Sequence, residues 1–145
     1  MALTIQWLSD GVSMPQLDYE KLSHWIELVA EKHGKQAHEL TYIFCNDEKI
    51  LEVNRKFLQH DYYTDIITFD YTRGKMLRGD IYLSLETVKT NAVQVGAEYE
   101  TELLRVIIHG VLHLCGINDK GPGEREIMEE NENKALDLYY NEIDK

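Results

Sequence analysis

One segment of the chain, residues 103–114, has apolar residues on almost every side of a predicted helix. A helix that is hydrophobic all round lies in the interior of a fold, because each of its faces must be covered. Two histidines, His109 and His113, interrupt this apolar run. A buried imidazole needs a polar partner, since burial of an unpaired polar group is unfavourable. The two rings therefore mark a candidate site.

Strand patterns come early in the chain and helix patterns dominate late. Four segments are typical of strands: 3–8, 40–45, 65–71 and 80–85. Five segments have the residue spacing of helices: 18–34, 47–58, 86–95, 98–115 and 123–141. Asp18 and Asp47 are the predicted caps of the first two helices, and Gly74 and Gly79 end a loop that suits a hairpin. This order predicts an α+β fold, a small mixed sheet of about four strands with helices packed on it.

Length and composition indicate one folded domain over residues 1–145. The chain is 43% apolar and has only two prolines. Its longest stretch without Lys, Arg, Asp or Glu, residues 106–118, is shorter than the ~20 apolar residues of a membrane span. The start lacks a secretory signal, and the two cysteines, Cys45 and Cys115, permit at most one disulfide. We therefore expect a cytoplasmic protein with free thiols and no membrane partner.

The charge of the chain is unevenly distributed. A net charge of −11 disfavours a nucleic-acid partner, because lysine and arginine drive binding to phosphates. Residues 49–78 are nevertheless locally basic, with six basic against four acidic side chains. Residues 123–145 hold eight acidic against three basic side chains. The acidity is thus concentrated at the end of the chain.

The two histidines are spaced to bind one metal ion. Residues four apart lie on one helix face, about one turn from each other. Gly116 follows the helix and, as a glycine, can adopt the left-handed conformation that turns the chain back. Such a turn lets Asp119 face the same metal, and a carboxylate is an acceptable third zinc ligand. Three protein ligands leave a fourth position for water, so this metal-binding helix in the C-terminal part predicts a catalytic zinc site.

The spacing His-x3-His-x2-Gly-x2-Asp is also that of metzincin peptidases, with Asp119 in place of their third histidine. Gly110 stands where those enzymes carry their catalytic glutamate. A metal-dependent hydrolase of a peptide or amide therefore stays an alternative, but one that would lack its base.

Three motifs stand out in the sequence, at residues 54–69, 79–81 and 109–119. Together they resemble the YbeY family of endoribonucleases. Residues 109–119 are similar to the family's His-Gly-x-Leu-His-Leu-x-Gly-x-Asp-His. Residues 54–69 resemble its Asn-x-x-Tyr-Arg-x-x-Asp-x-x-Thr-Asp-Val-Leu-Ser-Phe, and residues 79–81 match a Gly-Asp-Ile that opens a strand. The motifs stand in the family's order and cover about half of the chain.

The resemblance implies a zinc-dependent endoribonuclease that cleaves single-stranded RNA in ribosomal RNA maturation and in quality control of the small ribosomal subunit. His109, His113 and Asp119 would be the zinc ligands and the catalytic residues, and activated water would attack phosphorus. The implied partners are ribosomal RNA, the small ribosomal subunit and a ribosome-associated GTPase. Three aromatic side chains are candidates for stacking on unpaired bases: Tyr62, Tyr63 and Tyr71.

Two positions depart from the family pattern. Asp119 stands where the family has its third histidine. Asn118 stands where the family has the acidic residue that precedes this histidine. Leu58 stands where the family has an arginine that is implied to hold the RNA phosphate. Five basic residues are candidates to bind the substrate in its place: Arg55, Lys56, Arg73, Lys75 and Arg78. The alternative is a ribosome-assembly factor with little or no nuclease activity.

Overall fold

A single mixed sheet of four strands organises the fold. The computed structural model describes residues 4–58 and 64–143. The strands are β1 (Thr4–Ser9), β2 (Gln36–Cys45), β3 (Ile66–Asp70) and β4 (Met76–Ser84). They lie in the order β1-β2-β4-β3, with β3 antiparallel to β4 and the other neighbours parallel. The predicted α+β class and four-stranded mixed sheet are confirmed.

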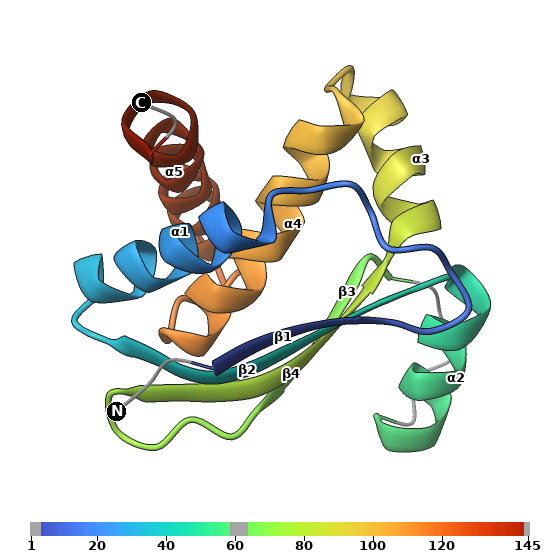
Figure 1. Ribbon diagram of the computed structural model, residues 1–145, viewed down its shortest axis with the longest axis horizontal. Coiled ribbons are helices and arrows are strands. Elements are labelled where there is room, and N and C mark those ends of the chain that lie inside the picture. Colours follow the sequence, from blue (N-terminus) through green and yellow to red (C-terminus); the bar gives the residue numbers. More distant parts are fainter. Residues whose placement is uncertain (1–3, 59–63, 144–145) are drawn as a thin grey trace.

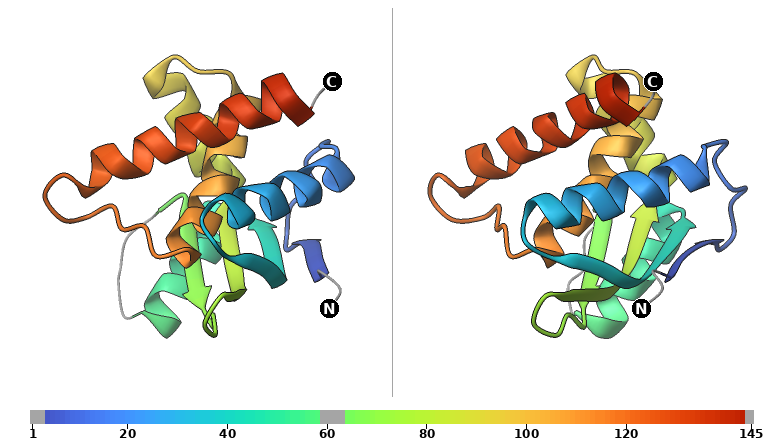
Figure 2. Two further views of the ribbon diagram at one scale, coloured as in Figure 1. Left: turned by 90° about the vertical axis from the view of Figure 1, so that its left-hand side faces the viewer. Right: turned by 60° about the vertical axis from the view of Figure 1, so that its left-hand side comes forward.

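Most of the helices lie on one face of this sheet, and one helix lies on the other face (Figures 1 and 2). The α-helices are α1 (Tyr19–Lys32), α2 (Asp47–Phe57), α3 (Leu85–Val95), α4 (Tyr99–Leu114) and α5 (Glu124–Asp137), followed by a π-helix, η1 (Leu138–Ile143). The main core lies between the sheet, α1, α4 and α5. A small second core, built on Ile50, Val53 and Ile67, lies under α2 on the other face.

Helix α4 is the central element of the main core. Nine of its residues, from Leu103 to Leu114, are buried. Gly110 faces the sheet, where a Cβ atom would lie 3.1 Å from Ile81 Cδ1 and 3.3 Å from Ile66 Cδ1. The helix therefore packs close to β3 and β4. Gly110 stands at the position of the catalytic glutamate in metzincins, and in this chain that position faces apolar side chains.

The cap of α2 differs from the prediction. Asn46, not Asp47, is the cap residue, and its side chain accepts a hydrogen bond from the Lys49 backbone N–H at 2.9 Å. The Asp47 carboxylate instead accepts hydrogen bonds from the Ser84 hydroxyl at 2.6 Å and from the Thr87 hydroxyl. Asp47 thus connects the start of α2 to the start of α3, a contact between distant segments that no local pattern indicates.

Gly79 does not end the hairpin loop but lies inside β4, paired with Leu40 of β2 and Asp70 of β3. A Cβ atom at this position would lie 2.6 Å from the Phe69 carbonyl oxygen and 3.3 Å from Leu114 Cδ1. The glycine therefore permits the close approach of a neighbouring strand and of α4. The hairpin itself is confirmed, with its turn at Gly74, which has a φ of +58°.

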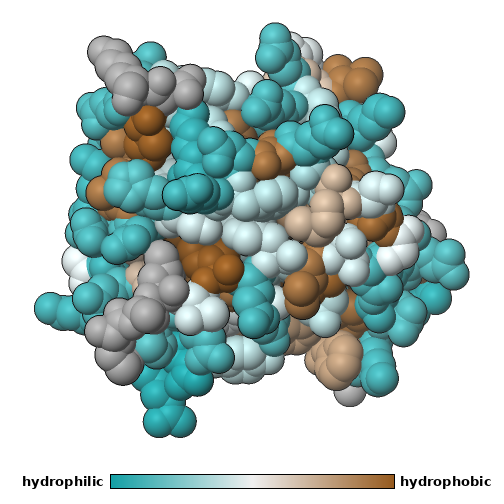
Figure 3. Space-filling model, in the orientation of Figure 1, coloured by the Kyte–Doolittle hydropathy of each residue, from teal (hydrophilic) through white to brown (hydrophobic). Residues whose placement is uncertain are grey.

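On the face of the molecule shown in Figure 3, apolar residues form small patches among hydrophilic ones. Among the helices that the structure describes, none combines the length and the apolar character needed to cross a lipid bilayer. Cys45 and Cys115 are free thiols.

We expect the substitution Gly79→Ala to destabilise the protein by about 1–3 kcal/mol, because the added methyl group meets backbone that cannot move aside easily. Urea unfolding followed by circular dichroism measures this change. Lys75→Ala, at an exposed position of the same hairpin, is the matched control and should change stability by less than about 0.5 kcal/mol. Equal stability of the two variants would contradict the close approach described at Gly79.

Candidate functional site

A cavity of about 880 Å³ lies between α4, α5, β3 and the end of α2. His109, His113 and Asp119 all line it. The three side chains that the sequence predicts as metal ligands therefore line one cavity, and two of them, His109 and Asp119, contact each other. Both imidazoles are half-buried instead of buried, because the apolar helix that carries them opens here onto the cavity.

The chain reversal after α4 places Asp119 next to His109. Gly116 has a φ of +99°, and its N–H donates to the His113 carbonyl at 3.0 Å. The Ile117 N–H donates to the Leu112 carbonyl at 3.1 Å, which completes the hydrogen-bond pair of a Schellman motif. As a result, Asp119 Oδ2 lies 3.3 Å from His109 Nε2. The predicted glycine turn is confirmed.

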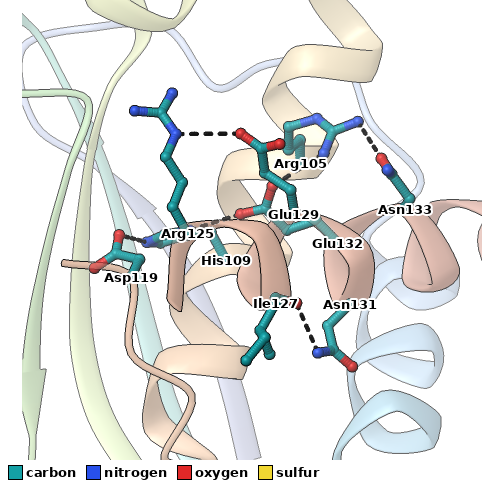
Figure 4. A network of polar contacts seen from close by, with 9 residues as sticks. All are labelled: Arg105, His109, Asp119, Arg125, Ile127, Glu129, Asn131, Glu132 and Asn133. Atoms are coloured by element: carbon teal, nitrogen blue, oxygen red, sulfur yellow. Dashed lines mark hydrogen bonds and ion pairs between the residues drawn. The ribbon is translucent and has the colours of Figure 1, made fainter. Parts of the chain in front are cut away.

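The other nitrogen of the His109 ring contacts a residue that sequence reasoning missed. His109 Nδ1 lies 2.7 Å from Glu132 Oε2, and Arg105 Nη1 donates to Glu132 Oε1 at 3.0 Å. Arg105 Nη2 also donates to Asn133 Oδ1 at 2.8 Å. Figure 4 shows this network between α4 and α5. Glu132 lies in the acidic end of the chain, and nothing in that local pattern distinguishes it from its solvated neighbours.

Carboxylates outnumber cations around the cavity. Among the described residues that line it, five are acidic: Asp65, Glu102, Asp119, Glu129 and Glu132. Three are basic: Arg105, Lys120 and Arg125. This excess of negative charge favours a bound cation.

The same environment shifts the pKa values of groups near His109. Burial raises the pKa of the Asp65 carboxyl above its usual value, and nearby His109 opposes this only in part. Burial also raises the pKa of Glu102. For His109, burial alone would lower the pKa, but the hydrogen bond to Glu132 and the surrounding carboxylates outweigh it, so the pKa is raised. These three pKa shifts have one physical origin, because several ionisable groups lie close together where little water reaches them.

The donor types of this site fit zinc. Two imidazoles and one carboxylate form a donor set found in catalytic zinc sites. A ligating histidine usually donates its other ring N–H to a carboxylate, and Glu132 occupies that position beside His109. Within residues 4–58 and 64–143, no three His, Cys, Asp or Glu side chains already surround a common metal position. His109 and Asp119 contact each other directly instead.

The five basic residues predicted to bind the substrate lie elsewhere. Arg73 and Arg78 line a hollow of about 620 Å³, where Arg78 forms an ion pair with Glu39 at 2.9 Å. Tyr71 lines the same hollow. Arg55 and Lys56 line another hollow, of about 500 Å³, along α2. Lys75 is exposed in the β3–β4 hairpin, and the predicted stacking residues Tyr62 and Tyr63 fall outside the described residues.

Comparison with known proteins gives the family. The sequence pattern of the family described as Endoribonuclease YbeY matches residues 8–140. The chain belongs to the YbeY family. Endoribonuclease YbeY of Bacteroides thetaiotaomicron is 65% identical over 94% of this chain and 98% of its own length. That of Porphyromonas gingivalis strain W83 is 47% identical over 91% of this chain and 87% of its own length.

A solved structure shares the fold of this chain. The solution structure of a Thermotoga maritima protein is 28% identical to this chain, with a TM-score of 0.68. The match covers 98% of this chain and 96% of that protein. The family expected from the three sequence motifs is confirmed.

Both departures from the YbeY motifs lie at the cavity. Leu58, the C-cap of α2, is 39% exposed and lines the cavity, as does Asp119. Leu58 is therefore not a core residue. The position at which the YbeY motif carries an arginine is apolar in this chain, while the described cations of the cavity lie on α4, α5 and the loop between them.

Proposed function

We propose that this protein is a zinc-dependent endoribonuclease that cleaves single-stranded RNA in the cytoplasm, during ribosomal RNA maturation and quality control of the small ribosomal subunit. The observation that carries the proposal is the meeting of His109, His113 and Asp119 at one cavity in a chain of the YbeY family. The relatives named Endoribonuclease YbeY support an RNA phosphodiester as the substrate.

His109, His113 and Asp119 would hold the zinc ion. The excess of carboxylates around the cavity supports binding of a cation at this place. A bound zinc ion supplies a nucleophile at neutral pH and positive charge beside the scissile phosphate. In the reaction, the oxygen of a water molecule bonds to phosphorus, one phosphorus–oxygen ester bond breaks, and the departing oxygen takes up a proton.

The phosphate would be held by cations of the cavity. Lys120 is exposed at the cavity, and Arg125 forms an ion pair with Glu129 at 3.2 Å on the surface of α5. Arg105 is already engaged by Glu132 and Asn133. We therefore assign the nearest phosphate contacts to Lys120 and Arg125. The five basic residues predicted from the sequence would contact RNA farther from the cleaved bond.

The apolar residues of the lining suit an unpaired nucleotide. These residues include Leu58, Val95 and Ala97. A base in a duplex is stacked and paired, so a single-stranded segment reaches a concave site with less rearrangement. The proposed partners accordingly remain ribosomal RNA, the small ribosomal subunit and a ribosome-associated GTPase.

A ribosome-assembly factor with little nuclease activity is the second candidate, and the apolar side chain of Leu58 at the cavity favours it. Hydrolysis of a peptide or amide is less well supported, because Gly110 faces the sheet and supplies no base.

Cleavage of an unstructured RNA tests the proposal. We expect slow cleavage by the wild-type protein that weakens as salt rises, because diffuse attractions of Lys and Arg hold the substrate. Leu58→Arg should raise the rate on the order of tenfold, since a guanidinium at the cavity stabilises the charge that gathers on the phosphate. Turnover is measured at two salt concentrations.

Leu8→Arg is the matched control, because it adds the same charge at an exposed position on β1 outside the cavity. It should leave the rate near that of the wild type. If the wild type and His109→Ala cleave equally, the cavity performs no phosphodiester chemistry and the assembly-factor function is favoured.

Zinc retention tests the ligand set. His109→Ala, His113→Ala and Asp119→Ala should each lose most of their zinc during dialysis against a chelator, since two remaining ligands hold an ion weakly. Metal content per chain is the measurement. His24→Ala, at an exposed position of α1, should retain as much zinc as the wild type. Full occupancy in His109→Ala would exclude this ligand set.

Variants of Asp119 test whether this residue binds the metal or only stabilises the loop. Asp119→His should keep zinc, because imidazole is a good zinc ligand, whereas Asp119→Asn should keep less, because a neutral amide is a poor one. The same dialysis provides the measurement. Equal retention by the Asp and Asn proteins would show that the carboxylate does not bind the metal.

A further inference from the structure

Glu132 is a carboxylate that is both buried and fully engaged. Its residue is 6% exposed. One oxygen lies 2.7 Å from His109 Nδ1, and the other accepts a hydrogen bond from Arg105 Nη1 at 3.0 Å. Removal of a carboxylate from water is strongly unfavourable unless charged or hydrogen-bonding partners compensate. The two partners of Glu132 provide that compensation, and they come from the same helix, α4.

Arg105 holds one oxygen of the Glu132 carboxylate, and His109 contacts the other. Its second terminal nitrogen donates to Asn133 Oδ1 at 2.8 Å, so one guanidinium holds two adjacent residues of α5. Arg105 and His109 are four residues apart on α4 and lie on one face of the helix. The planar guanidinium has a fixed geometry, which limits the positions that Glu132 can take relative to the imidazole. Figure 4 shows the resulting chain of contacts from Asn133 to Asp119.

This arrangement favours one position for the hydrogen of the neutral imidazole. A carboxylate only accepts hydrogen bonds, and one faces each ring nitrogen: Glu132 Oε2 lies 2.7 Å from Nδ1, and Asp119 Oδ2 lies 3.3 Å from Nε2. The shorter contact favours Nδ1 as the donor of the single hydrogen, toward Glu132. The lone pair of the neutral ring is then on Nε2. That atom lies 3.3 Å from Asp119 Oδ2. The nitrogen that is free to bind a metal is therefore the one that faces Asp119, another predicted ligand.

We propose that Glu132, held by Arg105, is a positioning residue that fixes the His109 ring with its Nε2 lone pair directed into the cavity. The inference rests on the proposed function, because the purpose of this orientation is to present a zinc ligand. Glu132 itself touches neither the metal nor the substrate and acts only through His109.

A purely structural role makes different predictions. Glu132 also connects α4 to α5 through Arg105, and a simple interhelix contact would contribute to stability whatever the state of the imidazole. The shorter contact of Glu132, however, is the one to His109. The hydrogen position on the imidazole separates the two roles, because a contact that only joins helices would not control it.

Nitrogen NMR of the zinc-free protein, at a pH where His109 is neutral, measures the hydrogen position directly. We expect the wild type to carry the hydrogen on Nδ1. Glu132→Gln should largely keep this form, because its amide oxygen still accepts the hydrogen bond. Glu132→Leu should shift the ring toward the form with hydrogen on Nε2, which free histidine favours. Hydrogen on Nε2 in the wild type, or no shift in Glu132→Leu, would overturn the inference.

Zinc affinity, measured by competition with a coloured chelator, gives the second readout. Removing the carboxylate that supports a ligating histidine should weaken binding roughly 10–100-fold in Glu132→Leu, and less in Glu132→Gln. Glu130→Gln, which removes an exposed carboxylate from the same helix, is the matched control and should bind zinc like the wild type. Unchanged affinity in Glu132→Leu would contradict the positioning role.

The two readouts distinguish failure of this inference from failure of the proposed function. The hydrogen position is measured without zinc or RNA, so it tests Glu132 alone. If His109 carries hydrogen on Nδ1 and the wild type binds no zinc, the proposed function is wrong. If the wild type binds zinc and Glu132→Leu binds it equally well, only the positioning role is wrong. Urea unfolding of each variant confirms that the compared proteins are folded.

Discussion

The packing of α4 against the sheet determines where every other part of the site lies. Gly110 lets the helix approach Ile66 and Ile81 so closely that this face of α4 has no room for a larger side chain without a shift of its neighbours. Because side chains of a helix are distributed around its axis, burial of the Gly110 face directs His109 and His113 toward its flank. The cavity is the space that remains on that flank between α5, β3 and the end of α2.

The electrostatics of the cavity follow from the helix that closes it. Helix α5 is rich in acidic residues, and most of them are exposed to water, where they contribute little. Glu132 is the exception among its neighbours, because it points toward α4 and is compensated there by Arg105 and His109. An acidic helix whose outer surface would repel RNA thus adds negative charge to the cavity on its inner side.

Local rules predicted most elements and the turn after α4 well, because those features depend on neighbours in sequence. The turn at Gly116 and the approach of Asp119 to His109 follow from residues within eleven positions of one another. Contacts between distant segments were not predictable in this way. Asp47 resembles a helix cap but bonds to the start of α3, and Gly79 resembles a loop residue but permits close packing inside a strand.

The same limit applies to the site. The contact between His109 and Glu132 spans 23 positions, and no periodicity of α5 marks that glutamate. The basic residues of the cavity were missed for a related reason. A count of local charge favoured residues 49–78, whereas the chain folds so that Arg105, Lys120 and Arg125 line the cavity. Charge density along the sequence does not show which face of an element a side chain occupies.

The separate origin of the ligands and of the cavity walls has a consequence for how such a protein can change over generations. The three metal-ligand candidates come from α4 and the turn that follows it, whereas Leu58 and Val95 come from the ends of two other helices. A substitution at either wall residue alters the shape and polarity of the cavity without changing the helix that carries His109. The cavity walls can therefore change independently of the ligand candidates, and Leu58, which stands where the YbeY motif has an arginine, is one of these wall residues.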